Sequence, residues 1–420
     1  MLAHSPHLPL VIDHSNMDGD ISAEDEEGSI LALKQYGRVS RVRLQMPVTS
    51  LQKRIVAMDD EYPILEHLII IHPVNDDSSI SQFPGTLQTP NLRHLLLEGF
   101  ALPMGSRLLT TAVGLVTLYI SMVHPSTYFH PNTLLRWLSF IPQLETLIVE
   151  FAFPVPNHDV ERQLTHTPIM TPTTLPNLHY LQFQGVNTYL EALVHRITAP
   201  RLEKLRIVFF NQLAFSVTRL LQFVNATENL RFKSAKFKFS DKYVDVQVYP
   251  HEEVVMYAFS VTVFCWHLDW QVSSTAQIFN SLGTLFSAVE HLTFEHSVHS
   301  RSSEEHNEPD RAKWRQLLGS FRNAKTLRIA RRLVKELSRC LELSDGELPL
   351  ELLPELQELT YFGRGNDDTF TSFIKDRQDA GRPLTLIRRS PSPDRNSPVL
   401  SPEPPLTPPP DDEAGSDDNT

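Results

Sequence analysis

A short apolar pattern that recurs along the chain constrains its fold more than any other feature of the sequence. The pattern reads apolar-x-x-apolar-x-apolar and runs from Val39/Val42/Leu44 to Leu356/Leu359/Tyr361. Its central positions are residues 42, 68, 95, 118, 147, 181 and 205, and, after an irregular middle, 292, 327 and 359. A repeat of about 20–50 residues is typical of arrays whose units are too small to bury an apolar face alone. Each pattern therefore predicts one short strand in a stack of similar units.

Between these strands lie segments with apolar residues at helical spacing, namely 132–141, 188–197, 217–224, 276–285 and 312–321. Apolar positions at i, i+3, i+4 and i+7 predict a helix with one buried face. One strand and one helix per unit predict an α/β leucine-rich-repeat solenoid, with parallel strands on the concave face and helices on the convex face. The Asn or Cys that commonly ends such a repeat is replaced by Phe100, Ala152, Val186 and Phe210, so the solenoid should be irregular.

Two segments depart from the repeat. Residues 230–266 alternate apolar and polar residues, as in Tyr243–Tyr249, and this favours a β-hairpin or meander inserted on the sheet. Residues 388–420 hold nine of the 31 prolines together with Ser, Asp and Glu, a composition typical of a disordered tail. We therefore expect a solenoid over residues 1–387 and a disordered acidic tail over 388–420.

The net charge and the cysteine content limit which classes of partner and which cellular compartment we expect for this chain. The formal charge of −12 argues against nucleic acid as a partner, because no basic stripe offsets it. The longest apolar window, 108–123, is too short to cross a bilayer, so no membrane partner is expected. Two cysteines, Cys265 and Cys340, and an N-terminus unlike a signal peptide favour an intracellular address, cytoplasmic or nuclear.

Motifs of catalysis and metal binding are scarce. The sequence contains no GxSxG, P-loop, HExxH or CxxC motif, so we expect no enzyme activity and no cofactor. Asn16, Asp18, Asp20 and Glu27 have the spacing of a calcium loop, but Ile21 occupies the position of the essential glycine. An acidic helix start at Ser22 is the favoured interpretation. His291, His296, His299 and His306 have no fixed zinc spacing, so a polar strand followed by an exposed loop is favoured over a metal site.

The remaining functional candidate is the row of strand residues that alternate with the buried positions. In a repeat array these residues line one continuous sheet face, and their mixed polar and aromatic character suits a protein partner. The candidate partner-binding residues are Arg41, Arg43, His67, His94, Glu98, Tyr119, Glu150, Tyr180, Gln182, Lys204, Arg206, His291, Glu295 and Arg328. The alternative is that many of these side chains are simply solvated.

The tail carries a second kind of candidate. Five Ser/Thr-Pro pairs predict proline-directed phosphorylation at Ser390, Ser392, Ser397, Ser401 and Thr407. Each phosphate would add about −1.5 to −2 charges to an already acidic segment.

Several longer motifs resemble a known family. Segments 5–12 (SPHLPLVI), 21–27 (ISAEDEE), 38–45 (RVSRVRLQ), 92–97 (LRHLLL) and 142–147 (PQLETL) resemble the C-terminal part of fungal (basidiomycete) F-box-like leucine-rich-repeat proteins. The resemblance covers about residues 5–388. It implies a solenoid whose repeats hold the substrate of a ubiquitin ligase, while an F-box preceding the repeats docks on a Skp-type adaptor and its cullin.

The chain departs from that family at its start. No LP-x-E opening lies near the N-terminus, and the one similar motif, residues 348–353, leads into another predicted strand. Adaptor and cullin binding are therefore expected only if an F-box is restored upstream. Two readings stay open: a non-catalytic substrate-recognition module with a truncated gene model, and a stand-alone repeat scaffold without a ubiquitin role.

Overall fold

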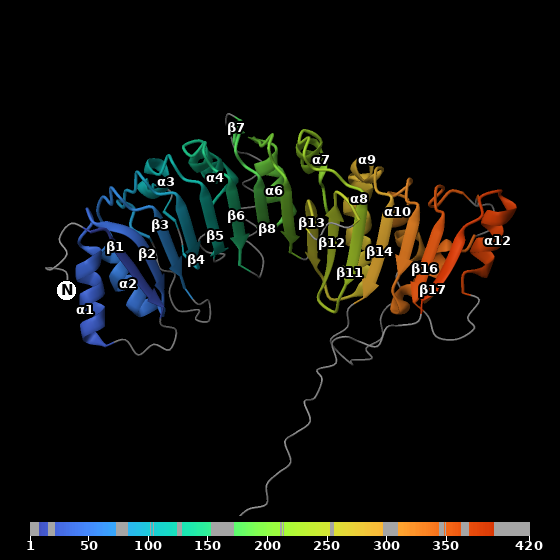
Figure 1. The fold of residues 1–420 in the computed structure, drawn as a ribbon, viewed down its shortest axis with the longest axis horizontal. Coiled ribbons are helices and arrows are strands. Elements are labelled where there is room, and N and C mark those ends of the chain that lie inside the picture. The colour runs from blue at the N-terminus through green and yellow to red at the C-terminus, as the bar shows by residue number, and fades with distance from the viewer. Residues whose placement is uncertain are drawn as a thin grey trace, which may run out of the picture.

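The computed structural model describes residues 8–15, 22–72, 83–100, 102–103, 105–123, 128–152, 172–210, 212, 214–252, 256–296, 310–343, 348, 350–362 and 369–389. These residues form a mixed α/β fold around a mostly parallel sheet of 15 strands. Figure 1 shows the strands side by side along an arc, from β1 at the N-terminal end to β17 at the C-terminal end.

The spatial order of the strands follows the chain except at one place. In that order the strands are β1 (Leu10–Ser15), β2 (Val39–Gln45), β3 (His67–Ile71), β4 (His94–Glu98), β5 (Thr117–Val123), β6 (Thr146–Phe151), β8 (Tyr180–Gly185), β10 (Lys204–Phe209), β13 (Phe259–Phe264), β12 (Tyr243–Tyr249), β11 (Ser234–Phe239), β14 (His291–His296), β15 (Thr326–Ile329), β16 (Glu358–Phe362) and β17 (Thr385–Arg389). The short strands β7 (Thr173–Thr174) and β9 (Ile197–Thr198) pair separately.

Helices occupy the connections between strands, and several lie toward the outer side of the arc (Figure 1). They are α1 (Ala23–Leu33), α2 (Val48–Val56), α3 (Arg107–Thr111), α4 (Pro131–Leu138), α6 (Asn187–Val194), α7 (Thr218–Asn225), α8 (Leu268–Ser281), α9 (Gly283–Phe286), α10 (Arg311–Leu318), η3 (Arg331–Leu333), α11 (Val334–Leu341) and α12 (Thr371–Asp379). The Ser22 hydroxyl accepts a hydrogen bond from the Asp25 amide at 3.1 Å, which confirms the predicted helix start at this residue.

The repeated pattern forms the core. All ten central positions, from Val42 to Leu359, are fully buried, and the apolar residues three before and two after each are at most 6% exposed. In two of the patterns the third apolar residue packs on an aromatic side chain of the following helix. Phe183 of β8 stacks on Tyr189 of α6 at a ring-centroid distance of 5.6 Å, and Phe294 of β14 meets Trp314 of α10 at 5.8 Å. The helices therefore cover one face of the sheet, and we call the other face the open face.

The irregular middle is part of the sheet itself. Strands β11 and β12 are joined by the short turn 240–242, which forces them to run antiparallel, and β12 is also antiparallel to β13. Because β13 then pairs parallel with β10 and β11 pairs parallel with β14, only β12 opposes the direction of its neighbours. The antiparallel pairing of β12 agrees with the hairpin or meander predicted over residues 230–266, because a three-residue connection cannot cross over to a parallel partner.

The C-terminal boundary also differs slightly from the predicted one. Strand β17 continues to Arg389 and pairs with β16, two residues past the expected end of the solenoid at 387. Thr385, Ile387 and Arg389 follow one another on the open face, but Leu386 is 41% exposed and Arg388 replaces the third apolar residue, so the strand ends the array without a buried face of its own.

Candidate functional site

All fourteen residues predicted to bind a partner lie on the open face. Their side chains alternate with the buried positions, and the strand register aligns them in three rows that cross the sheet. The first row contains Arg41, His67, His94, Tyr180, Lys204 and His291, the second contains Arg43, Tyr119, Gln182, Arg206 and Arg328, and the third contains Glu98, Glu150 and Glu295. Most are half-buried, because side chains on neighbouring strands about 4.8 Å apart shield each other.

At the N-terminal end of the open face two histidines stack. The rings of His67 and His94 are 4.5 Å apart and 8° from parallel, and His94 Nδ1 lies 3.2 Å from the Thr117 hydroxyl. Burial, followed by the neighbouring His94 and Arg41, lowers the pKa of His67. This part of the face therefore presents His67 mainly as a neutral ring beside the exposed guanidinium of Arg41.

Glu150 is the hub of a network in the middle of the face. Its carboxylate accepts a hydrogen bond from the Tyr119 hydroxyl at 3.2 Å and another from the Gln182 amide, whose oxygen accepts from the Tyr180 hydroxyl. Burial and the charge of Glu150 raise the pKa of Glu98. Strands β5, β6 and β8 thus share one hydrogen-bonded network, and Glu98 of β4 lies close enough to be affected by the charge of Glu150.

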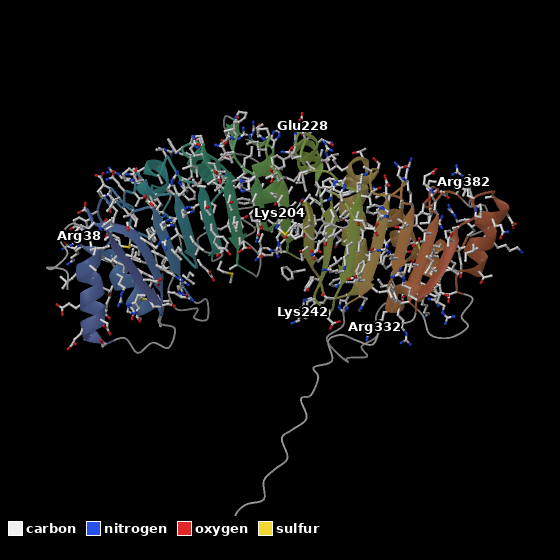
Figure 2. The ribbon with its side chains drawn as sticks, in the orientation of Figure 1. Arg38, Lys204, Glu228, Lys242, Arg332 and Arg382 are labelled. Carbon is white, nitrogen blue, oxygen red and sulfur yellow. The ribbon has the colours of Figure 1, made fainter. Side chains whose placement is uncertain are left out.

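Next to this network, two tyrosines flank a lysine. Lys204 Nζ lies 5.2 Å from the ring centre of Tyr180 and 4.4 Å from that of Tyr257. Both distances are within the range of cation–π contact. Burial and the neighbouring Arg206 lower the pKa of Lys204. We call Tyr180, Lys204, Arg206 and Tyr257 the central cluster, and Figure 2 shows Lys204 near the middle of the arc.

The sequence prediction omitted the open-face residues of the meander. Asp245 of β12 accepts hydrogen bonds from Thr262 at 2.9 Å, from Ser260 at 3.2 Å and from Gln247 at 2.6 Å. Ser260, Gln247 and Lys236 continue the second row from Arg206 toward Arg328. The alternation in 243–249 was a usable signal, but treating the segment as an insertion removed its residues from the face.

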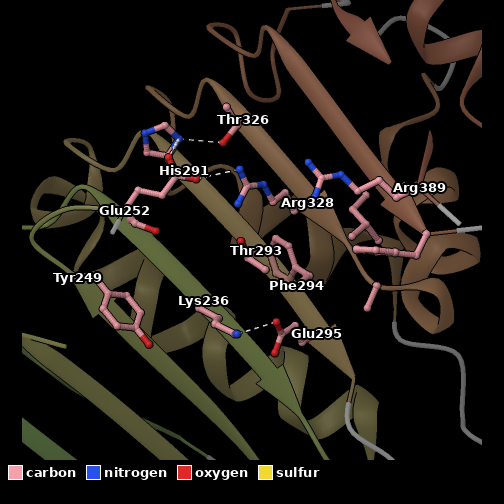
Figure 3. A pocket seen from close by; sticks show the side chains of 14 residues that line it. Lys236, Tyr249, Glu252, His291, Thr293, Phe294, Glu295, Thr326, Arg328 and Arg389 are labelled. Atoms are coloured by element: carbon pink, nitrogen blue, oxygen red, sulfur yellow. Dashed lines mark hydrogen bonds and ion pairs between the residues drawn. The ribbon is translucent and has the colours of Figure 1, made fainter. Parts of the chain in front are cut away.

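A hollow of about 470 Å³ lies at the C-terminal third of the open face. Its polar lining comes from β11, β12, β14, β15, β17 and the connection after β12, and Figure 3 shows these side chains converging on it. Arg328 Nη2 lies 2.9 Å from a carboxylate oxygen of Glu252, Lys236 Nζ lies 2.6 Å from Glu295, and His291 Nδ1 lies 2.9 Å from the Thr326 hydroxyl. Sequence analysis named His291, Glu295 and Arg328, but not Lys236 or Glu252.

Cys265 and Cys340, the two thiols, are buried rather than presented on the open face. Burial, followed by the charge of Asp269, raises the pKa of Cys265 to about 12. Within the described ranges no group of three or more His, Cys, Asp or Glu side chains could hold a metal ion. No helix of the described part is long and apolar enough to cross a membrane.

Several sequence candidates lie outside the described residues. The phosphorylation candidates Ser390, Ser392, Ser397, Ser401 and Thr407 belong to the tail, and residues 16–21 of the calcium-like spacing and His299 and His306 of the histidine series fall in the other undescribed ranges.

Comparison with known proteins gives no family match and a weak structural likeness for this chain. No protein-family model matches it, and no curated protein matches it. Among solved structures, a chain of "Crystal structure of TLR13-ssRNA13 complex" aligns over 84% of this protein at 14% sequence identity with a TM-score of 0.31. The alignment spans 45% of that chain, so less than half of its length is represented. A likeness this low does not establish a shared fold or ligand.

Proposed function

We propose that this protein is a non-catalytic binding module of the leucine-rich-repeat type that holds a protein partner on its open face. The observation that carries the proposal is the central cluster near the middle of the sheet. Tyrosine and arginine dominate the energetics of protein interfaces, and such anchors cluster near the interface centre. Tyr180, Tyr257 and Arg206 supply these side chains at half-buried positions whose conformations neighbouring residues already restrict.

The rows on either side of the central cluster supply the surrounding contacts. Histidines and arginines lie toward β2, the Glu150 network lies over β4 to β8, and paired charges lie over β11 to β15. Polar groups arranged in this way add specificity and orientation, while the buried aromatic area adds most of the affinity.

The partner class follows from the family resemblance and belongs to the same proposal. The repeats resemble those of fungal F-box-like receptors, so the partner on the open face is proposed to be a substrate of a ubiquitin ligase. A Skp-type adaptor and a cullin join only through an F-box upstream of this sequence. The alternative is a stand-alone scaffold that uses the same face and never meets the ligase.

The test is affinity purification of the tagged full-length chain from its native cells, read by mass spectrometry. The double variant Tyr180→Ala/Arg206→Ala removes two anchors of the central cluster. We expect the affinity for the partner, and with it the recovery, to fall by about 30-fold for each anchor removed, since each hot-spot residue contributes about 2 kcal/mol. The matched control is Arg136→Ala/Phe140→Ala, which removes one arginine and one aromatic side chain that are exposed on and after helix α4.

Equal partner recovery by the central-cluster variant and the wild type would refute binding through this face. Adaptor and cullin among the recovered proteins would support the ligase role, whereas reproducible partners without them would support the scaffold. A steady substrate turnover by the purified chain would overturn the non-catalytic reading.

A further inference from the structure

The hollow over β11, β14, β15 and β17 presents three cationic side chains from three different strands. Lys236 comes from β11, Arg328 from β15 and Arg389 from the end of β17. Two carboxylates, those of Glu252 and Glu295, line the same hollow. The hollow is thus more cationic than the chain as a whole, which carries a formal charge of −12.

One of these carboxylates reaches the cations from outside the sheet. Glu252 follows β12 in the connection to β13, and its two oxygens lie 2.9 Å from Arg328 Nη2 and 3.8 Å from His291 Nδ1. The His291 ring is held in place by its contact with the Thr326 hydroxyl (Figure 3). Arg328 therefore already holds a carboxylate that arrives from a segment other than a sheet strand, and the His291 ring lies beside it.

The contact made by Glu252 is weak enough to be exchanged. The Arg328 side chain is 41% exposed and that of Glu252 is 39% exposed. Exposed ion pairs of this kind contribute little to stability, because water and salt screen them. A ligand that places one carboxylate on Arg328 and another on a second cation of the hollow would displace Glu252.

We propose that this hollow is a binding site for an acidic segment of the partner protein, in polyproline II conformation, with a carboxylate at every third residue. The inference rests on the proposed function, because it assigns the chemistry of the partner at one part of the open face. Glu252 occupies the site when the partner is absent.

The spacing of the cations supports this ligand. Strands β11 and β15 are two strand spacings apart, as are β15 and β17, and neighbouring strands are about 4.8 Å apart. The register places Lys236 and Arg328 in one row, roughly 10 Å apart across the sheet, whereas Arg389 lies two residues further along β17, beyond Ile387, which is the residue in line with Arg328. A polyproline II peptide repeats every third residue at about 9.3 Å on the same side. An extended β-strand would instead turn every third side chain to the opposite side.

The probe is a fluorescein-labelled peptide, (Pro-Pro-Glu)₄, whose binding to the purified full-length chain is measured by fluorescence anisotropy at about 50 mM salt, where screening is modest. The control peptides are (Pro-Pro-Gln)₄, which lacks charge, and Pro₈Glu₄, which has the same composition with its four carboxylates contiguous. We expect saturable binding of the first peptide, no binding of the second, and at least threefold weaker binding of the third.

Variants of the hollow should move this affinity in opposite directions. Arg328→Gln should weaken binding of (Pro-Pro-Glu)₄ about tenfold and Arg389→Gln about threefold, since each removes a charge-assisted contact. Glu252→Gln should tighten binding about threefold, because it removes the competing carboxylate. Arg322→Gln, an equal loss of charge at an exposed turn outside the hollow, should leave binding unchanged.

Three results would overturn the inference: equal binding of the two Glu peptides, unchanged binding by Arg328→Gln and Arg389→Gln, or weaker binding by Glu252→Gln. Melting curves of the variants show that any loss of binding does not reflect unfolding. A fourth result also overturns it. If the probe binds only after Asp411, Asp412, Glu413, Asp417 and Asp418 are changed to amides, the occupant is this chain's own tail and not a partner.

The peptide-binding test of the hollow can fail while the partner-recovery test of the central cluster succeeds, and the reverse. Tyr180 and Arg206 do not line the hollow, so Tyr180→Ala/Arg206→Ala should bind the peptide normally. Loss of the native partner by that double variant, with no peptide binding by the wild type, would leave the proposed function standing and remove only the acidic ligand.

Discussion

Arg377 is fully buried in the C-terminal unit, and its replacement by Met should loosen that unit without unfolding the rest of the sheet. Its guanidinium donates hydrogen bonds to three carbonyls of the turn before β16, at 3.1 Å to Leu353, 3.1 Å to Pro354 and 3.0 Å to Leu356. Leu353 has a φ of 50°, a left-handed conformation that costs a branched residue about 1–2 kcal/mol. Arg377 therefore holds a strained turn in place.

The magnitude follows from these contacts. Hydrogen bonds to a charged group contribute about 1.5–3 kcal/mol each, so three of them give roughly 5–9 kcal/mol. Desolvation of the guanidinium opposes this by several kcal/mol, and the same desolvation lowers the pKa of Arg377. Methionine removes the desolvation cost, and it also removes the cation–π contact of the guanidinium with the Phe373 ring, whose centre lies 5.6 Å from Cζ. The net loss for Arg377→Met should be about 3 kcal/mol.

The assay is hydrogen exchange read by mass spectrometry. Because each unit of a repeat array contacts only its neighbours, amides of β16 and β17 should exchange roughly a hundredfold faster, while those of β2 to β6 should not change. Arg382→Met is the matched control, because the Arg382 side chain is 56% exposed and lies 3.6 Å from the carboxylate of Glu355. Unchanged exchange in β16 and β17, or equal acceleration in β2 to β6, would refute the reasoning.

Four further perturbations test other parts of the structure. Gly185→Ala should lower the free energy of unfolding by about 1–3 kcal/mol, because a Cβ there would lie 2.8 Å from the ring of Phe183; denaturant unfolding that matches the wild type would contradict this packing. Leu147→Asp should unfold the units around β6, because a carboxylate replaces a fully buried side chain; an unchanged melting curve would show that the strand register is wrong. The pKa of His67 is lowered, so between that pKa and about 6.5 the unfolded chain binds more protons than the folded chain. The contribution of His67 to stability is therefore complete above this pH window and falls as the pH drops through it. The melting temperature should be lower at pH 5.5 than at pH 7.5, and His67→Gln should reduce the difference. Cys265 should resist alkylation in the native chain, because its thiol is buried and its pKa of about 12 keeps it protonated; rapid labelling without unfolding would contradict its placement.

Much of the sheet was predictable because burial repeats with a short period. Val42, Leu147 and Leu359 belong to units far apart in the sequence, yet all three are fully buried strand centres. Period-two alternation then assigns their neighbours to the opposite face, so the positions of Arg41, Glu150 and Arg328 on one surface also follow from the sequence.

Other features depended on contacts that no local pattern encodes. The sequence indicates strands over 243–249 and 259–264, but their place between β10 and β14 depends on pairing across the sheet. Once β12 runs antiparallel between β11 and β13, residues such as Gln247 and Ser260 complete a row that begins at Arg43.

On the open face too, some properties follow from the sequence and others depend on the tertiary structure. Composition and alternation determined that the open face is polar and aromatic. Only the tertiary structure decided that Lys204 lies between Tyr180 and Tyr257, and that Glu252 reaches Arg328 from a connection 76 residues away in the chain. A side chain's partners on a sheet are set by strand order and register, which arise when the units stack. The sequence of a single unit determines which face a residue occupies, and the neighbouring units determine what it contacts there.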